Sequence, residues 1–264
     1  MNIRLDGKTA IVTGSTAGIG FAIAKGLAES GAAVVVNGRT ERRVAHAVAE
    51  IKAAIPAAKV QGFEADLGTA EGVQALIAKF SNTDILVNNL GIFEPKAFFD
   101  IPDEDWERFF RVNVLSGVRL ARHYTPAMVK RGWGRVIFIS SESAVQIPAE
   151  MVHYGMTKTA QLAVARGLAE TVASTGVTVN SVLPGPTRSE GVEKFVEVVG
   201  RQAGKSFEQT EKDFFRNIRP SSLLKRFATN EEVANMVVYL ASEQASATTG
   251  SAVRVDGGVI RAIV

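Results

Sequence analysis

Short apolar segments alternate along the chain with longer segments whose apolar residues recur at helical spacing. The apolar segments are rich in Val, Ile and Ala and show little alternation, as in strands buried on both faces of a parallel sheet. We predict strands at residues 9–13, 33–36, 59–63, 85–88, 135–140, 178–183 and 252–255. We predict helices at about residues 18–30, 41–54, 69–80, 103–131, 153–175 and 230–242.

The strand–helix–strand alternation indicates an α/β fold. We expect a Rossmann-like, doubly wound parallel sheet of about seven strands with helices on both faces. No low-complexity linker interrupts the pattern, and the strands continue almost to residue 264. We therefore predict a single domain spanning residues 1–264.

Composition narrows the class of partner. The 264 residues are 46% hydrophobic, which is enough for a large core, and 30 basic residues barely exceed 27 acidic ones. The net charge of +3, without a dense Lys/Arg run, argues against a nucleic-acid partner. The chain has no cysteine, which excludes disulfides and thiolate metal sites. Because neither a signal core nor an apolar run of membrane-spanning length is found, we expect a soluble cytoplasmic protein without a membrane partner.

One segment, at about residues 187–228, breaks the alternation. It follows a predicted strand end, where ligands bind in open α/β sheets, and it contains Phe195, Phe207, Phe214 and Phe215 among many charges. We favour a substrate lid, since loops of this length are usually functional or disordered. The alternative is a helical excursion packed on the surface. The Phe content suggests a partly apolar substrate.

A glycine-rich turn, Thr13-Gly14-Ser15-Thr16-Ala17-Gly18-Ile19-Gly20, joins the first strand to the first helix. Glycine allows a sharp turn and close approach to a pyrophosphate, and a helix N-terminus offers free N–H groups to it. The spacing is G-x-x-x-G-x-G rather than G-x-G-x-x-G. The strand–turn–helix context predicts a dinucleotide site.

The end of the second predicted strand bears on which dinucleotide binds. An NAD site usually has an acidic residue there, but this chain has Asn37-Gly38-Arg39. Arg39 can pair with a 2′-phosphate, so the residues favour NADP, with NAD as the alternative. Asp66 can accept from the adenine amino group, and Asn89 and Gly91 close the fourth strand, where they serve as a turn or as ligand contacts.

Tyr154 and Lys158 are the strongest candidates for chemistry. A separation of four residues puts them on one face of the predicted helix. A phenol, with an ordinary pKa of about 10, needs a neighbouring cation to exchange protons near neutrality, and the Lys158 ammonium can provide it. Ser141 ends the fifth strand, where its hydroxyl can hold a substrate oxygen. No His/Asp/Glu cluster has metal-ligand spacing, so we expect no metal.

Together these motifs resemble the short-chain dehydrogenase/reductase family. The matching residues run through nearly the whole chain in family order: residues 13–20, Asn88-Asn89-Leu90-Gly91, Asn113, Ser141, Tyr154-Gly155-Met156-Thr157-Lys158, Pro184-Gly185 and Asp256-Gly257-Gly258. One departure is Leu90, where the family usually has Ala. The family pattern of Gly38-Arg39 implies a preference for NADP.

The resemblance implies a catalytic tetrad of Asn113, Ser141, Tyr154 and Lys158. Tyr154 would be the acid–base group, Ser141 would orient the substrate oxygen, and Lys158 would bind the nicotinamide ribose and lower the pKa of Tyr154. Asn113 would hold a water in a proton relay to Lys158. The implied cofactor-binding residues, with those from the turn, are Gly14, Ser15, Thr16, Gly18, Ile19, Gly20, Arg39, Asp66, Leu67, Asn89, Gly91, Tyr154, Lys158, Pro184, Gly185, Thr187 and Ser189.

The expected function is NAD(P)-dependent oxidoreduction between an alcohol and a carbonyl on a small-molecule substrate. Alternatives are the subclass that reduces 3-oxoacyl thioesters and a non-catalytic nucleotide-binding regulator on the same fold. Helices 103–131 and 153–175 are apolar on more than one face, which a single sheet cannot cover. We therefore expect them to form a subunit interface, and the resemblance implies a homotetramer or a dimer.

Overall fold

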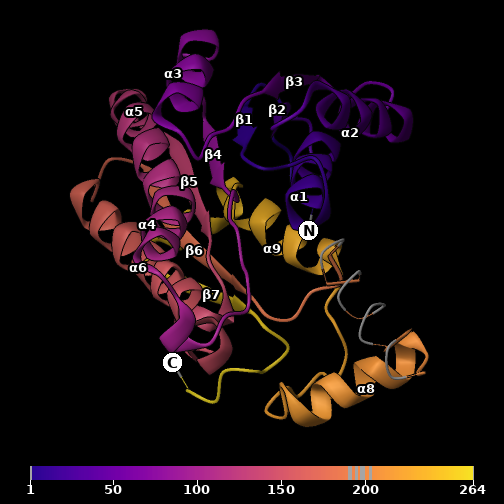
Figure 1. Cartoon of the computed structure of the whole chain (residues 1–264). Coiled ribbons are helices and arrows are strands. Elements are labelled where there is room, and N and C mark those ends of the chain that lie inside the picture. Colours follow the sequence, from indigo (N-terminus) through magenta and orange to yellow (C-terminus); the bar gives the residue numbers. More distant parts are fainter. Residues whose placement is uncertain (1, 190–191, 194–195, 197–199, 202–203, 264) are drawn as a thin grey trace.

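The computed structural model describes residues 2–189, 192–193, 196, 200–201 and 204–263. Its strands pair in parallel throughout, in the order β3-β2-β1-β4-β5-β6-β7 (Figure 1). Their bounds are β1 Thr9–Val12, β2 Ala33–Gly38, β3 Val60–Glu64, β4 Ile85–Asn88, β5 Gly134–Ile139, β6 Val177–Pro184 and β7 Ala252–Val255. Each predicted strand is present with only small shifts of its ends, so the predicted doubly wound fold is confirmed.

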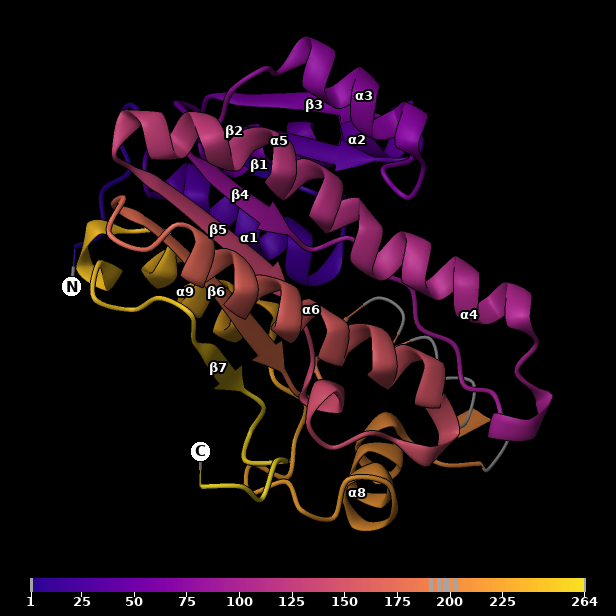
Figure 2. The same ribbon diagram turned by 90° about the vertical axis from the view of Figure 1, so that its left-hand side faces the viewer.

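Helices cover both faces of the sheet (Figures 1 and 2). On one face lie α1 (Gly18–Glu29), α2 (Glu41–Ala54) and α9 (Asn230–Leu240), whose apolar residues share one core cluster with the strands. On the other lie α3 (Ala70–Lys79), α5 (Ser116–Arg131) and α6 (Val152–Thr171), which share a second cluster. This two-sided cover explains why the strands show no apolar/polar alternation.

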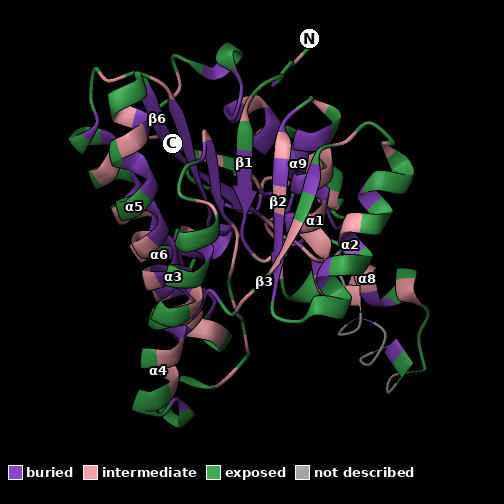
Figure 3. Cartoon of the chain, turned by 90° about the horizontal axis from the view of Figure 1, so that it is seen from above, coloured by how far each residue is buried: buried purple, intermediate pink, exposed green. Residues whose placement is uncertain are grey.

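The central strands are the most deeply buried part of the molecule, as the purple strands in Figure 3 show. Every residue of β4, β5 and β6 is buried. In register, Ile11 of β1 lies between Val35 of β2 and Leu86 of β4. Because burial of one such side chain contributes about 1.5–3 kcal/mol, these strands form a rigid platform. Their carboxyl ends therefore hold whatever follows them in fixed positions.

The predicted continuous helix 103–131 is wrong in one place. The structure has α4 (Asp103–Phe110), then a π-helical turn η2 (Arg111–Leu115), then α5. A π turn inserts one extra residue and frees backbone groups from the helical ladder. Here the turn contains Asn113, whose backbone carbonyl accepts a hydrogen bond from Gln161 Nε2 at 2.6 Å. The interruption thus turns a candidate catalytic residue toward α6.

The segment predicted as a lid is only partly described. Residues 190–191, 194–195, 197–199 and 202–203 lie outside the described residues, and Phe195 is among them. Helix α8 (Phe207–Asn217) stands apart from the two helical layers (Figure 1) and begins with a capping box between Ser206 and Gln209. Phe215 packs with Phe227 in a small separate apolar cluster. A lid function for this segment stays a prediction, as does the extent of the domain.

The described residues contain neither a membrane-spanning helix nor a metal-binding cluster. No helix there combines the length and the apolar character required to span a bilayer. Within the same residues, no group of three or more His, Cys, Asp or Glu side chains is placed to hold a metal ion.

Candidate functional site

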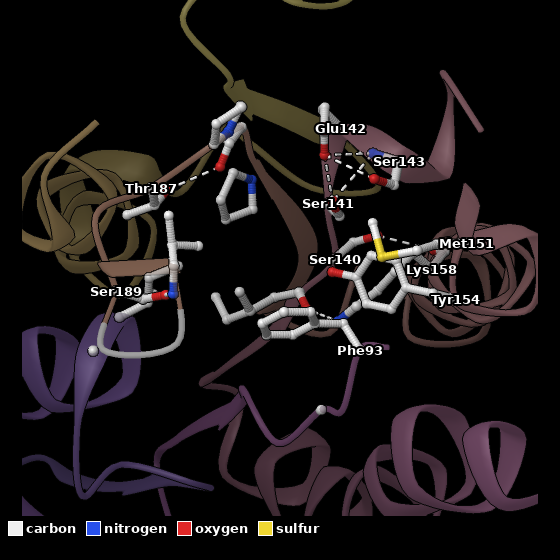
Figure 4. Close-up of a pocket in the computed structure, with 18 of the residues that line it drawn as sticks. Phe93, Ser140, Ser141, Glu142, Ser143, Met151, Tyr154, Lys158, Thr187 and Ser189 are labelled. Carbon is white, nitrogen blue, oxygen red and sulfur yellow. Dashed lines mark hydrogen bonds between the residues drawn. The ribbon is translucent and has the colours of Figure 1, made fainter. Parts of the chain in front are cut away.

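A cavity of about 620 Å³ opens at the carboxyl ends of the central strands (Figure 4). In open α/β sheets this edge is the usual position of a ligand site. It contains twelve of the predicted residues: Gly18, Ile19, Gly20, Asn89, Gly91, Ser141, Tyr154, Lys158, Pro184, Gly185, Thr187 and Ser189. The described residues lining it do not include Gly14, Ser15, Thr16, Arg39, Asp66, Leu67 or Asn113.

The glycine-rich turn has the conformation expected of a phosphate cradle. Gly14 and Gly18 have φ of +59° and +57°, which side chains other than hydrogen rarely allow. A Cβ at Gly20 would lie 2.4 Å from Asn89 Nδ2 and 2.5 Å from the Gly14 carbonyl. Ala17 precedes α1 and supplies no side-chain cap, so the first N–H groups of the helix remain free for a ligand. The residues present therefore fit a dinucleotide pyrophosphate.

Two asparagines hold this turn in place. Asn89 Nδ2 donates to the carbonyls of Thr13 and Gly14, both at 2.9 Å. Asn37 Oδ1 accepts from Gly14 N at 3.1 Å. The Ser15 hydroxyl donates to Val12 O at 2.7 Å and accepts from Asn37 N at 3.0 Å. Its side chain thus ties β1 to β2.

The remaining predicted adenosine-side residues lie along the same sheet edge. Arg39 is exposed just after β2, and Asp66 is exposed just after β3, where its carboxylate accepts from Gly68 N at 2.9 Å. Leu67 is buried in the second core cluster, and Thr16 lies beside Gly38. Because β3, β2 and β1 are neighbours, these residues follow strand ends next to the turn. Their contacts with a cofactor stay predictions.

The nicotinamide-side residues come from the loop after β6. Gly185 lies so close to Asp256 that a Cβ there would approach the Asp256 carbonyl to 2.5 Å. Thr187 Oγ1 donates to Gly185 O at 2.9 Å. The side chain of Ser189 lies against Gly18, since a Cβ at Gly18 would be 3.5 Å from it. The loop after β6 therefore lies against the glycine-rich turn at the cavity.

Tyr154 and Lys158 meet Ser141 at the base of the cavity. Figure 4 shows Ser141 and Glu142 above the Tyr154 ring and Phe93 below it. Lys158 Nζ lies 5.5 Å from the centre of the Tyr154 ring. It donates to Ile139 O at 2.9 Å and to Gln161 Oε1 at 3.3 Å. The predicted convergence of these side chains is thus present.

The pKa values of Tyr154 and Lys158 are both shifted from their ordinary values, and the shift of Tyr154 is opposite to the expected one. Burial raises the pKa of the Tyr154 phenol above its ordinary value, its hydrogen bond with Ser141 lowers it, and the Glu142 carboxylate raises it. Burial lowers the pKa of the Lys158 ammonium to about 7. We expected Lys158 to lower the pKa of Tyr154, but in this structure the desolvation of the phenol outweighs any such effect.

Asn113 lies behind the cavity wall. Its side chain accepts from Ile92 N at 2.8 Å, and it donates to Ile92 O and Thr157 Oγ1, both at 3.0 Å. Gln161 then joins the Asn113 carbonyl to the Lys158 ammonium. The water that the resemblance implies beside Asn113 stays a prediction.

Sequence reasoning missed a charged group beside the serine. Glu142 is only 5% exposed, and its carboxylate accepts from Ser141 Oγ at 2.6 Å and from Arg219 Nε at 3.2 Å. Arg219 follows α8 and lies 77 positions further along the chain. The position of Glu142 directly after Ser141 is the one signal in the sequence, and nothing in the pattern pairs it with Arg219. The apolar residues Phe93, Met151 and Ile218, which also line the cavity, were missed too.

Comparisons with known proteins agree with this geometry. Residues 14–260 match a family model described as enoyl-(acyl carrier protein) reductase, adh_short_C2. The chain is 48% identical over 263 residues to the uncharacterized oxidoreductase YvaG of Bacillus subtilis, with 100% of both chains covered. It is 35% identical over 255 residues to a D-beta-hydroxybutyrate dehydrogenase of Rhizobium meliloti, covering 95% of this chain and 98% of that protein.

Among solved structures, the L-sorbose reductase of Gluconobacter frateurii, complexed with NADPH and L-sorbose, superposes with a TM-score of 0.93. It is 33% identical, and both chains are covered completely. The match to the family model spans most of the chain, and the relatives span nearly all of it. The chain therefore belongs to the short-chain dehydrogenase/reductase family and is an NAD(P)-dependent oxidoreductase that interconverts alcohols and carbonyl compounds.

Proposed function

We propose that Tyr154 exchanges the proton and Ser141 orients the substrate oxygen in the reduction of a ketone to an alcohol and in its reverse. The observation that carries this proposal is the meeting of Tyr154, Ser141 and Lys158 in the cavity that also contains the glycine-rich turn. A bound NADPH supplies the hydride. All other steps are assigned to side chains of this protein.

Tyr154 is suited to donate a proton at neutral pH. Because burial raises the pKa of its phenol, the hydroxyl stays protonated and is ready to protonate a developing alkoxide. Ser143 N and Tyr154 both approach the Ser141 hydroxyl, whose own proton is directed at Glu142. Ser141 therefore has a fixed orientation beside the phenol. This fixed pair positions the substrate oxygen for proton transfer.

Lys158 and Asn113 complete the proposed tetrad. The Lys158 ammonium lies against the sheet, hydrogen-bonded to Ile139 O, and faces Gly91. A Cβ at Gly91 would lie 3.3 Å from Lys158 Nζ, so glycine leaves room beside the amine for a ribose hydroxyl. Asn113 is a positioning residue, since its carbonyl orients Gln161 and Gln161 orients Lys158.

For the cofactor we propose a preference for NADP over NAD. Arg39 is exposed after β2, and the structurally similar L-sorbose reductase is complexed with NADPH. A guanidinium binds a phosphate through paired, charge-assisted hydrogen bonds. Asp66 and Leu67 would then contact the adenine on the other side of the same sheet edge.

We also propose a setting for the enzyme: a cytoplasmic homotetramer or dimer, with residues 187–228 as the substrate lid. Lining residues from this segment support that part of the proposal, and they include Phe214, Ile218 and Arg219. A lid that contributes both apolar and charged groups can close the site around a substrate and exclude water.

Replacement of the phenol tests the chemical assignment. Tyr154→Phe removes the proton donor and leaves the ring in place, so we expect kcat to fall by about 10²–10⁴-fold. The dissociation constant of NADPH, measured by fluorescence titration, should change by less than about two-fold. Undiminished turnover would defeat the assignment of Tyr154.

Replacement of Arg39 tests the cofactor preference. Arg39→Ala should weaken NADPH binding about ten-fold or more, because a charge-assisted hydrogen bond contributes about 1.5–3 kcal/mol. NADH lacks the 2′-phosphate, and its affinity should hardly change. Titration of both cofactors against both proteins decides the point, and equal losses for the two would reject the role of Arg39.

A further inference from the structure

The wall above Tyr154 contains a buried carboxylate, Glu142, that the proposed mechanism uses only to orient Ser141. Glu142 Oε2 accepts hydrogen bonds from Ser141 Oγ at 2.6 Å, Ser143 N at 2.7 Å and Ser143 Oγ at 3.0 Å (Figure 4). Its other oxygen, Oε1, accepts from Arg219 Nε at 3.2 Å. A carboxylate oxygen can accept more than one hydrogen bond, so Oε1 keeps capacity for a further donor. Glu142 is also part of the cavity lining.

Arg219 is already engaged by two carboxylates. Its Nε bonds to Glu142, and its Nη1 lies 3.3 Å from Glu150 Oε1 and 3.1 Å from Ile218 O. The side chain is only 11% exposed. Because two carboxylates already share its one positive charge, Arg219 leaves no net positive charge at this wall for a substrate anion.

The charge of the lining follows from these pairs. Among the described residues that line the cavity, Glu142 and Glu150 face the single guanidinium of Arg219. The Lys158 ammonium, at the base of the cavity, is directed toward Ile139 O and Gln161. A carboxylate substrate entering here would lose its hydration and meet a carboxylate that has no spare cation. A hydroxyl group would meet a hydrogen-bond acceptor.

Apolar side chains also line the cavity. Phe93 packs edge-on against Tyr154, with ring centroids 6.3 Å apart, and Met151 and Ile218 also line the cavity. Such side chains contact the carbon skeleton of a substrate and offer no hydrogen bonds. The cavity therefore combines a hydrogen-bond acceptor beside the reacting position with apolar side chains.

We propose that this site takes an uncharged hydroxyketone or its polyol product and rejects carboxylate substrates, with Glu142 accepting a hydrogen bond from a substrate hydroxyl close to the reacting carbon. The proposal rests on the oxidoreductase function proposed above. On this proposal, the substrate of this chain differs in charge from that of the hydroxybutyrate dehydrogenase relative, whose named substrate is an anion. The proposed substrate is of the same class as the L-sorbose bound by the structurally similar L-sorbose reductase.

The test compares pairs of ketones in which a carboxylate replaces a hydroxymethyl group. L-sorbose pairs with the ketogluconate that has a terminal carboxylate in place of a hydroxymethyl group. Hydroxyacetone pairs with pyruvate in the same way, with the charge next to the carbonyl. With the wild-type enzyme and NADPH, kcat/KM from the loss of nicotinamide absorbance should favour the uncharged member of each pair by at least about ten-fold.

A variant without the Glu142 charge tests whether this carboxylate causes the preference for uncharged ketones. Glu142→Gln keeps the shape of the side chain and removes the charge, so the preference for the uncharged member should fall by about ten-fold or more. Glu243→Gln is the matched control, because Glu243 bonds to Trp133 and does not line the cavity, and it should leave the preference unchanged. An unchanged preference in Glu142→Gln would remove Glu142 from the proposal.

The outcomes separate this inference from the proposed function. Preferential reduction of the keto acids by the wild-type enzyme overturns the inference and leaves the proposed function intact. Binding of NADPH without reduction of any ketone defeats the proposed function itself. The wild-type comparison needs no variant, so it decides the inference even if Glu142→Gln does not fold.

Discussion

Lys158 is an amine held almost completely out of water, at 4% exposure. Its folded-state pKa of about 7 lies below the ordinary value of 10.5, because burial disfavours the charged form. Between these two values the unfolded chain binds the proton and the folded chain does not. Since stability rises with pH wherever the unfolded state binds more protons, Lys158 destabilises the fold most at and below pH 7 and progressively less up to pH 10.5.

The prediction is a pH-dependent difference between wild type and Lys158→Met, which lacks the titrating group. From pH 7 to pH 9, the free energy of unfolding of the wild type should rise by roughly 2 kcal/mol relative to the variant, as one pKa unit corresponds to about 1.4 kcal/mol. Urea denaturation at several pH values measures it. A difference that stays constant with pH contradicts a depressed pKa for Lys158.

Individual residues of the site differ in how far the sequence alone could predict them. Tyr154 and Lys158 were predictable because their helical spacing is local. Glu142 was not, because its importance comes from Arg219, which only the folded chain brings to 3.2 Å. The raised pKa of Tyr154 was also out of reach, since it depends on how far the cavity floor excludes water.

At the scale of elements, the junction of β1 and α1 requires glycine at position 20, where there is no room for a side chain. A methyl group at Gly20 would overlap Asn89 Nδ2 at 2.4 Å. Asn89 cannot move without losing its hydrogen bonds to Thr13 and Gly14, which join β4 to the end of β1. We predict that Gly20→Ala lowers the free energy of unfolding by about 1–3 kcal/mol and weakens NADPH binding at least about ten-fold.

A matched control is available in α6. A methyl group at Gly167 would meet nothing within 4 Å, and glycine in a helix interior is about 0.5–1 kcal/mol less favourable than alanine. Gly167→Ala should therefore keep or raise stability and leave NADPH affinity unchanged. Denaturation curves and cofactor titrations of the two variants test the pair, and equal effects would show that the close approach at Gly20 is unimportant.

Elements were more predictable than their interruptions. Strands buried on both faces and amphipathic helices leave a local pattern, which is why the seven strands and the helices between them matched expectation. The π turn at Arg111–Leu115 leaves none. Its cause is the bonding of Asn113 to Ile92 and Gln161, which lie 21 and 48 positions away in the chain.

At the scale of the whole molecule, apolar side chains gather at the outer end of α4. Phe99 is 96% exposed and forms an edge-to-face pair with Phe98, which in turn contacts Trp106. Phe110 is exposed further along the same helix. Helices α4 and α5 follow one another end to end, and α6 runs alongside them over one face of the sheet (Figure 2). This surface is therefore continuous with the helices predicted to form an interface. Large exposed apolar surfaces of this kind mark contacts between proteins.

We therefore predict an oligomer built through these helices. Light scattering at micromolar concentration should give a mass of two or four chains of 28.2 kDa. Phe110→Asp places a charge in the proposed contact and should shift the protein to smaller species with unchanged circular dichroism. Ala49→Asp, on the exposed side of α2 in the other helical layer, is the control and should keep the wild-type mass. A monomeric wild-type protein would contradict the predicted oligomer. An equal fall in mass for Phe110→Asp and Ala49→Asp would show that the interface is not formed by α4, α5 and α6.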